Sequence, residues 1–304
     1  MTEEAQTSKD DLKELTTLRS KVLEDLEKNR KLLSDIESAI SRNTGDTFEP
    51  QKLNKRDPGA DASMKVSTGI SRLDDLLNGG LPAGSNVLVS GPPYSSKLTV
   101  ADRFIISSLL SGFPVIVVSL DRDINSLRTD LSRAGLALEK YEENGLLKFV
   151  DAYSKNIQME SNAKNAITID NAGNISNFLK TMDTICANVV SKFGRYMMVF
   201  FSLTGWITQS VEDKNFPKAF QHFSQRRKLE GATTLFLIED GIFQKSLYEN
   251  MNYFMDGSLE FRSESSSEYL RVRGMKNVRS RDWVEVLNTE QGISLGSFEL
   301  KRIR

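Results

Sequence analysis

The first part of the chain carries a seven-residue repeat of apolar positions. Steps of three and four residues alternate, so both sets of positions fall on one face of a helix, and seven of the nine are apolar. The first set is Leu12, Arg19, Leu26, Leu33 and Ile40, and the second is Leu15, Val22, Asn29 and Ile36. The repeat predicts a coiled-coil helix within residues 1–42 that binds a protein partner or a second copy through residues 12–40. The alternative is a single amphipathic helix packed on its own domain.

The next segment, residues 43–63, contains Gly, Pro and charged residues and shows no apolar period. Such a composition is typical of a flexible linker. From Met64 onward the pattern changes to short apolar runs that alternate with amphipathic helical segments. We therefore expect one folded domain over residues 64–304.

The pattern in this domain predicts an α/β fold with a mostly parallel sheet flanked by helices, followed by antiparallel strands from about residue 257. The expected parallel strands are 86–91, 114–120, 146–152, 196–203 and 233–240, and the expected helices are 97–111, 124–134, 174–193 and 215–229. Residues 154–173 are polar and rich in Asn, so we expect a surface insertion there.

Composition narrows the setting of the protein. The 304 residues include 40 basic and 41 acidic side chains, a balance that argues against a dedicated binder of polyanions. The one cysteine, Cys186, cannot form an intrachain disulfide and fits a reducing compartment, so a cytoplasmic location is expected. No apolar run reaches the roughly 18 residues of a membrane span, and no secretory signal is visible.

Candidate chemistry lies in the stretch VLVSGPPYSSKLTV, residues 87–100. A phosphate-binding loop reads G-x-x-x-x-G-K-[ST] between a strand and a helix, because glycine amides close around the phosphates and the hydroxyl binds Mg²⁺. Gly91 and Lys97 stand at the required separation, but Ser96 replaces the second glycine and Leu98 replaces the hydroxyl residue.

The segment VSTGISRLDDLLNGGLPAGSNVLVSGPP (66–93) resembles the opening of the KaiC-type branch of RecA-like ATPases. The resemblance continues through GATTLFLIED, NYFMDGSLEF and YLRVRGMKN, and it covers about residues 64–304. It implies a RecA-like fold. It also implies a nucleotide at a degenerate phosphate loop formed by Gly91, Pro92, Pro93, Tyr94, Ser95, Ser96, Lys97, Leu98 and Thr99.

Several positions depart from the family pattern at the site of metal binding. Tyr94 and Ser96 replace family glycines, and a Cβ at Ser96 is expected to strain the loop. Leu98 has no lone pair for Mg²⁺, and Thr99 points about 100° away from it on a helix. Phe201 stands where the family has its Walker B aspartate. We expect no metal site and no required cofactor, or else ATP bound without Mg²⁺.

Two further departures concern catalysis. The paired carboxylates that activate water in the family become Asp121 and Arg122, and Asp121 is at most a vestigial base. The simpler interpretation is that Asp121 caps the helix at 124–134. The family's K-M-R segment, which reaches a neighbour's nucleotide in a ring, is matched by RGMKN, so Lys276 and Arg279 are the candidates for action in trans.

These departures predict a pseudo-ATPase that works as a regulatory or scaffolding protein, either alone or in a hetero-oligomer with an active paralogue. The first alternative is a metal-independent ATP sensor that uses Lys97 and the start of the following helix. The second is a DNA-associated protein, because residues 271–283 contain five basic side chains and Trp283. A charged, solvated strand is the simpler interpretation of that segment, so nucleic acid is not expected as a partner.

Overall fold

The computed structural model describes residues 64–298 apart from positions 134, 161–162, 211–214 and 290–291. All of these residues belong to one compact unit, Gln51–Arg304. The predicted coiled coil (1–42) and linker (43–63) lie outside the described residues and remain predictions. Within the described part of the chain, no helix combines the length and apolarity needed to cross a bilayer.

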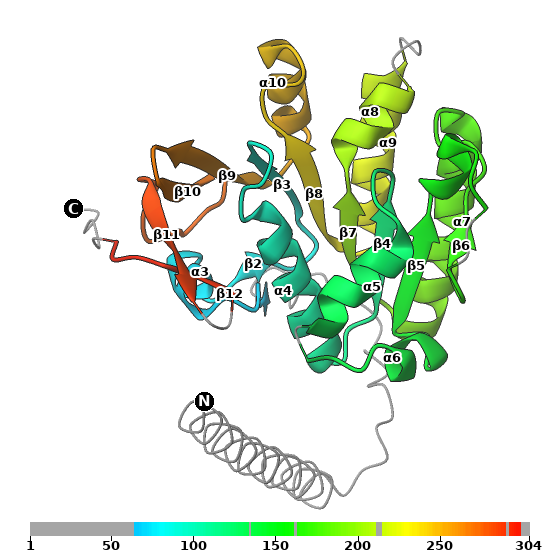
Figure 1. Cartoon of the computed structure of the whole chain (residues 1–304), viewed down its shortest axis with the longest axis horizontal. Helices are drawn as coiled ribbons and strands as arrows, with labels where there is room; N and C mark the ends of the chain where they lie inside the picture. Colours follow the sequence, from blue (N-terminus) through cyan, green and yellow to red (C-terminus); the bar gives the residue numbers. More distant parts are fainter. Residues whose placement is uncertain (1–63, 134, 161–162, 211–214, 290–291, 299–304) are drawn as a thin grey trace, which may run out of the picture. The chain divides into compact units, whose positions relative to one another are not determined.

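A ten-stranded mixed sheet forms the centre of the domain (Figure 1). Its order is β12-β11-β10-β9-β3-β8-β7-β4-β5-β6, and every pairing from β9 to β6 is parallel. The strands are β3 (Asn86–Gly91), β4 (Val115–Ser119), β5 (Leu147–Asp151), β6 (Ile167–Thr168), β7 (Met197–Phe201), β8 (Thr233–Glu239), β9 (Gly257–Glu264), β10 (Ser267–Arg273), β11 (Val284–Thr289) and β12 (Gly292–Leu295). The predicted parallel strands and the C-terminal antiparallel strands are confirmed.

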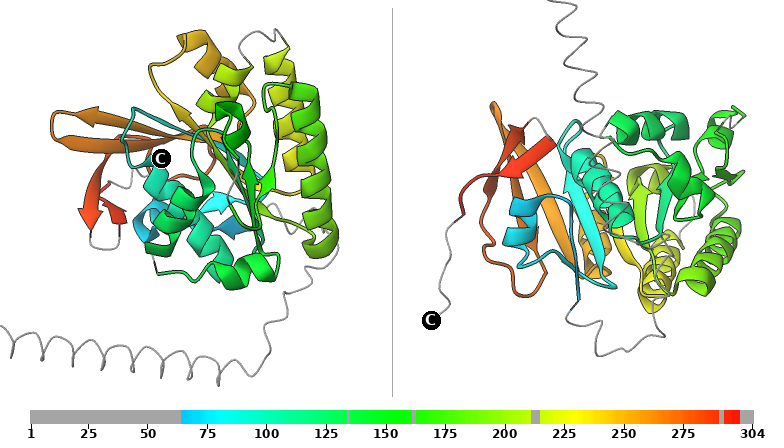
Figure 2. Two further views of the ribbon diagram at one scale, coloured as in Figure 1. Left: turned by 45° about the vertical axis from the view of Figure 1, so that its right-hand side comes forward. Right: turned by 90° about the horizontal axis from the view of Figure 1, so that it is seen from below.

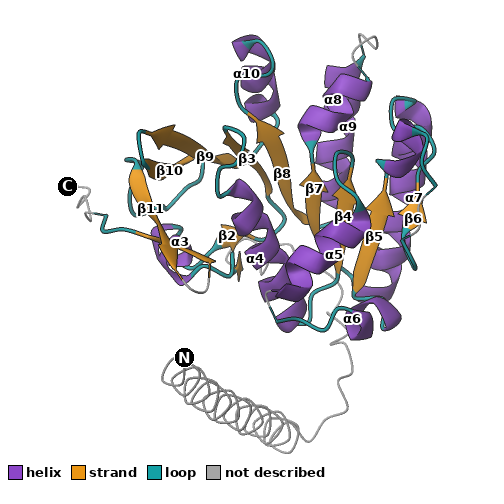
Figure 3. Cartoon of the chain, viewed as in Figure 1, coloured by secondary structure: helices purple, strands orange, loops and turns teal. Residues whose placement is uncertain are grey.

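Helices cover both faces of the parallel strands (Figures 2 and 3). Right-handed crossovers place α4 (Lys97–Leu110) and α5 (Ile124–Arg133) on one face and α7 (Ile175–Phe193) and α9 (Phe216–Leu229) on the other. The shorter elements are α3 (Ser71–Leu76), α6 (Glu139–Glu143), α8 (Leu203–Gln209), α10 (Lys245–Tyr253), the 3₁₀ helix η1 (Ser154–Ile157) and the hairpin β1–β2 (Lys65–Val66, Leu81–Pro82).

Strands β3, β4 and β7 are buried along their whole length, as their continuous apolar runs predict. On the α7–α9 face, a cluster of aromatic rings fills the space between sheet and helices. Trp206 lies at its centre, within 4.7 Å of Phe178 and 5.5 Å of Phe200 and Phe223 between ring centroids. Tilted and edge-to-face contacts of this kind add to the stabilisation from burial.

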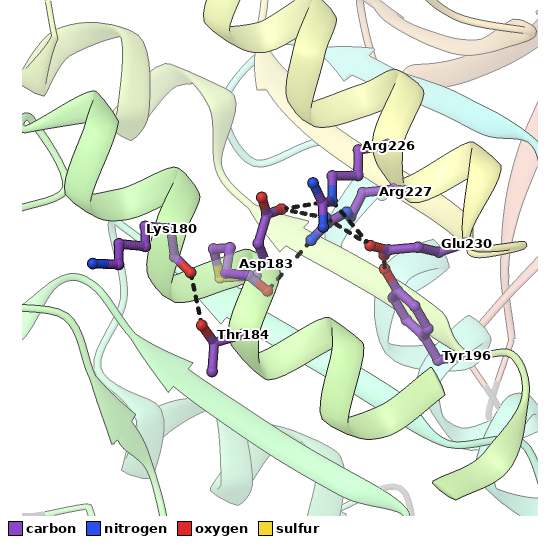
Figure 4. Close-up of polar contacts among 8 residues, drawn as sticks. Lys180, Asp183, Thr184, Tyr196, Arg226, Arg227 and Glu230 are labelled. Carbon is purple, nitrogen blue, oxygen red and sulfur yellow. Dashed lines mark hydrogen bonds and ion pairs between the residues drawn. The ribbon is translucent and has the colours of Figure 1, made fainter. Parts of the chain in front are cut away.

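A buried ion-pair network joins α7 and α9 beneath this cluster (Figure 4). The guanidinium of Arg227 is fully buried and lies 2.6 Å from Asp183 and 3.0 Å from Glu230. The hydroxyl of Tyr196 donates to Glu230 at 2.6 Å. Burial raises the pKa of the neighbouring Cys186 thiol to about 11, which leaves the thiol protonated and unreactive. The network therefore fixes helix position.

The segment 154–173 is more than the surface insertion that we expected. It forms η1 and then β6, which pairs in parallel with the end of β5 and extends the sheet by one strand. Ile169 and Ala172, just beyond β6, are buried. The polar composition hid these apolar contacts because they come from isolated residues with no period.

Candidate functional site

The candidate phosphate loop spans Pro92–Ser96, and the predicted strand before it and helix after it are confirmed as β3 and α4. Gly91 ends the strand, and a side chain there would collide with the Cβ of Phe261 and the hydroxyl of Ser95, each 2.7 Å from an ideal Cβ. The loop closes on itself, because the amide of Ser95 donates to the carbonyl of Pro92 at 3.2 Å. The turn from strand to helix is thus formed in spite of the missing glycines.

The two glycine replacements behave differently from our expectation. Ser96 adopts an ordinary conformation (φ −67°), so no strain lies there. Tyr94 carries the left-handed backbone instead, with φ 66°, at the position of a family glycine. Its side chain is fully exposed and so neither caps nor fills the loop. A non-glycine residue in this region costs on the order of 1–3 kcal/mol.

Lys97, the first residue of α4, is buried, and partners from this chain surround its ammonium group. Nζ lies 2.7 Å from Oε2 of Glu239, donates to the carbonyl of Pro92 at 2.8 Å and contacts the hydroxyl of Ser95 at 3.3 Å. Glu239 ends β8 and lies directly opposite Gly91 in the sheet. The lysine is therefore a buried part of the loop and not a solvated surface side chain.

A second carboxylate binds the loop at Ser96. Glu268, near the start of β10, accepts from the amide of Ser96 at 2.8 Å through Oε1 and from its hydroxyl at 2.5 Å through Oε2. The hydroxyl of Ser96 makes no capping bond to its own helix. At the start of α4, Ser96 thus binds the carboxylate of Glu268, and Lys97 binds the carboxylate of Glu239.

Apolar side chains, Leu98 and Phe201, stand at the two positions that bind metal in the KaiC-type ATPases. Leu98 lies against the hydrophobic core, and Phe201 is 1% exposed at the end of β7. The methyl group of Thr99 lies near Gly292, the first residue of β12. Among the residues that the structure describes, no group of three or more His, Cys, Asp or Glu side chains is placed to hold a metal ion.

Asp121 lies just beyond β4 and does not cap α5. Asp123 does so instead, by accepting from the amide of Ser126 at 2.9 Å. Burial raises the pKa of Asp121, while a hydrogen bond with the Ser202 side chain lowers it. Arg122, the other half of the altered pair, forms an ion pair with Asp130 of α5 at 2.6 Å. Asp121 and Arg122 thus link the end of β4 to Ser202 and to Asp130 of α5, respectively.

The structure does not bring Lys276 or Arg279 to the chain's own phosphate loop. Strand β10 runs antiparallel to β9, and β9 runs parallel to β3, so the residues after Arg273 lie at the sheet edge opposite Gly91. Both side chains are exposed. Action on another subunit stays a prediction for both residues.

Part of the basic stretch 271–283 makes contacts within the chain, through Arg271, Arg273 and Trp283. Two guanidinium groups lie over the ring of Trp283, with Arg262 at 4.3 Å and Arg271 at 4.4 Å from the ring centroid. Arg271 and Arg273 also pair with Glu260 at 2.6 and 3.2 Å. These side chains line a cleft of about 730 Å³ between α10 and strands β9 and β10.

Comparison with known proteins identifies the family. The family described as the KaiC ATPase matches residues 66–288, which is more than half of the chain. The chain belongs to the KaiC family. A KaiC-like protein of Pyrococcus horikoshii OT3 has the same fold, with a TM-score of 0.61 at 21% identity over 77% of this chain and 99% of that one.

Relatives of the KaiC-family chain include UPF0273 proteins of archaea. One from Methanopyrus kandleri is 35% identical over 36% of this chain and 43% of its own length. One from Pyrococcus furiosus is 36% identical over 31% of this chain and 38% of its length. The circadian clock oscillator protein KaiC of Parathermosynechococcus lividus is 29% identical over 33% of this chain and 18% of its length. The chain thus matches less than half the length of these relatives.

Sequence reasoning missed the acidic residues around the loop of this KaiC-family domain. Glu239 and Asp240 end the run TTLFLIED, and burial raises the pKa of Asp240, with a further increase from the charge of Glu260. Two adjacent carboxylates at the end of the predicted strand 233–240 were a visible signal for Glu239 and Asp240. Glu268 lies 172 residues from Ser96, and no local pattern pointed to it.

Proposed function

We propose that this KaiC-family domain does not hydrolyse Mg-ATP and acts through contacts with other proteins. The observation that carries the proposal is that apolar side chains occupy the two positions where the family binds the metal: Phe201 is buried, and Leu98 is partly buried and packs against the core. Mg²⁺ prefers oxygen ligands in near-octahedral geometry, and neither side chain offers one. Phosphoryl transfer depends on that metal to neutralise developing charge.

The residues at the positions of the family's paired carboxylates, Asp121 and Arg122, support the same proposal. Arg122, in place of the second carboxylate, pairs with Asp130 and contributes to packing. Burial raises the pKa of Asp121. Without a metal-bound phosphate for water to attack, Asp121 has no role as a general base in this proposal. In this proposal the surface of the domain binds other proteins. Residues 12–40 remain the proposed contact with a partner or with a second copy of the chain.

The test is ATP turnover and binding by the full chain, measured in parallel with Mg²⁺ and with EDTA. We expect no turnover above the level of Lys97→Ala and no gain in affinity from Mg²⁺. Mg²⁺-dependent binding with turnover that Lys97→Ala abolishes would show that Leu98 and Phe201 do not prevent catalysis, and the proposal would then be wrong.

A second candidate is a metal-independent sensor of nucleotide phosphates. The observation that favours it is the retained loop, in which Tyr94 holds the left-handed conformation of a glycine at an energetic cost. The amide of Ser96 already binds a carboxylate, so it can serve an anion. ATP binding that persists in EDTA and is lost in Lys97→Ala is the expected result for this candidate.

Nucleic acid is not part of the proposal. A base that stacked on Trp283 would compete with the two arginines that already lie over its ring, at 4.3 and 4.4 Å from the centroid. Glu260 also offsets two of the basic side chains of the stretch. Retention on single-stranded DNA at low salt would contradict this part of the proposal.

A further inference from the structure

The contact between Glu268 and Ser96 joins two residues that the fold brings together from distant parts of the sequence. Its geometry is bidentate, with one carboxylate oxygen on the Ser96 amide at 2.8 Å and the other on the Ser96 hydroxyl at 2.5 Å. We propose that Glu268 is an internal occupant of the phosphate loop and that its carboxylate must leave before a phosphate group can bind.

The amide that Glu268 uses is one that a phosphate would need. In loops of this type, successive backbone N–H groups before the helix close around the phosphate, and the residue before the lysine contributes one of them. The positive end of α4 adds to the attraction for an anion. The first turn of α4 contains no acidic residue, so the Glu268 carboxylate supplies the negative charge at this end.

The serine at position 96 is matched to this glutamate. A family glycine would offer the amide alone, whereas Ser96 adds a second donor that points to Oε2 of Glu268. Hydrogen bonds to an ionised acceptor are the stronger ones, so the added hydroxyl stabilises the occupied state. The departure at Ser96 therefore raises the barrier to phosphate binding by holding a competitor in place.

The lysine of the loop is held in a parallel way. Glu239 lies 2.7 Å from the ammonium group of Lys97, and its side chain is one quarter exposed. A phosphate entering the loop would meet two carboxylates whose charges oppose it. Release of Glu268 needs a change of side-chain rotamer and no change in strand pairing, since three rotatable bonds separate its carboxylate from the backbone.

The inference deepens the second candidate function, the metal-independent phosphate site, and it is tested on the full chain in EDTA. The probes are inorganic tripolyphosphate and ATP, measured by calorimetry with wild type, Glu268→Gln and Ser96→Gly. Glu264→Gln is the matched control, because Glu264 lies on the same hairpin and pairs with Arg262 away from the loop. We expect Glu268→Gln and Ser96→Gly to bind both probes at least tenfold more tightly than wild type does. The control Glu264→Gln should bind them with the affinity of wild type.

The double variant separates release of Glu268 from other effects of a glycine. If both changes act through one contact, their effects on affinity will fall short of the sum. Glu268→Gln keeps the shape of the side chain, and Ser96→Gly restores the family residue, so folding can be checked by thermal unfolding of each. Unchanged affinity in both single variants, or full additivity in the double variant, would overturn the inference.

Failure of the inference and failure of the proposed function give different results. Mg²⁺-dependent turnover by the wild-type chain would show that Leu98 and Phe201 do not prevent catalysis. It would not affect the comparison of the variants' affinities in EDTA. A purely structural role for Glu268 predicts a lower unfolding temperature for Glu268→Gln with no gain in affinity. That result would assign the carboxylate to capping of α4 alone.

Discussion

Tyr94 shows how a single residue can keep the shape of a loop after its usual glycine is lost. Its φ of 66° is rare for an aromatic residue, and its exposed ring gains nothing from burial that could offset the strain. The surrounding contacts must therefore hold the backbone, among them the bond from Ser95 to Pro92 and the ammonium of Lys97 on the same carbonyl. The cost at one residue is borne by the loop as a whole.

The strain predicts an unusual result for substitutions at Tyr94. Glycine adopts this conformation freely, whereas alanine keeps the clash of its Cβ, so Tyr94→Gly should be about 1 kcal/mol more stable than Tyr94→Ala. Urea unfolding of both variants measures the difference. Equal stability would mean that the loop relaxes away from the left-handed conformation once the ring is removed.

At the scale of elements, α4 connects the phosphate loop with the rest of one face of the sheet. Its first residue holds Glu239, and its second turn carries Asp102, which faces the Arg122–Asp130 ion pair between β4 and α5. One carboxylate oxygen of Asp102 is buried without a hydrogen-bond partner. Arg103, beside it, reaches Gly292, the first residue of β12. Helix α4 thus relays contacts to three other elements.

Asp102 makes stability depend on pH. Burial raises its pKa to about 7, against the lowering effect of Arg122, whereas in the unfolded chain it titrates near 3.9. Between these values the unfolded state has lost the proton that the folded state keeps, so stability falls as pH rises from about 4 to 7.

We expect Asp102→Asn to remove this loss and to gain about 2 kcal/mol relative to wild type between pH 5 and pH 8, after allowance for partial exposure. Urea midpoints at the two pH values measure it. Asp75→Asn, which changes an exposed carboxylate, is the control. A parallel pH dependence in wild type and Asp102→Asn would show that Asp102 titrates normally.

The sequence was most informative where apolar runs were continuous. Strand 86–91 and helix 97–111 were predicted within a residue, because β3 is buried on both faces and α4 follows a known loop pattern. Strand β6 and helix α10 were missed. The first has two residues and no apolar period, and the second buries Met251 alone among its nine residues. Elements that contribute little to the core leave little trace in the pattern.

The candidate site was predictable in its covalent neighbourhood and not in its long-range contacts. Gly91 to Thr99 could be placed from spacing, and the structure confirms the strand, loop and helix around them. The partners of Ser96 and Lys97 come from β10 and β8, which requires the sheet order that sequence alone does not give. The strain was assigned to Ser96 rather than Tyr94 because φ values follow from closure of the whole loop.

At the scale of the whole molecule, the KaiC family matches residues 66–288, and the predicted coiled coil lies outside the described residues. Association through the apolar seam at residues 12–40 therefore stays a prediction. A coiled coil that carries two polar seam residues, Arg19 and Asn29, is expected to be limited in length and fixed in register.

Self-association through this seam gives a direct prediction. Leu26→Asp combined with Leu33→Asp places charges in the seam and should reduce the mass of the full chain in solution to that of a monomer. Glu24→Gln, outside the seam, should leave the mass unchanged. Light scattering measures both. A monomeric wild type would assign the helix to a different partner or to its own domain, and an unaffected oligomer would move the interface to residues 64–304.

The two tryptophans occupy contrasting surroundings, and this has an optical consequence. Trp206 is enclosed by phenylalanine rings in the core, whereas Trp283 is partly exposed and contacts Arg262 and Arg271 in the cleft that also contains Glu260. A molecule that entered this cleft and competed for Glu260 would shift Arg271 and so change the emission of Trp283. Trp206 would meanwhile keep a constant spectrum, so the chain carries both an intrinsic fluorescent reporter and its reference.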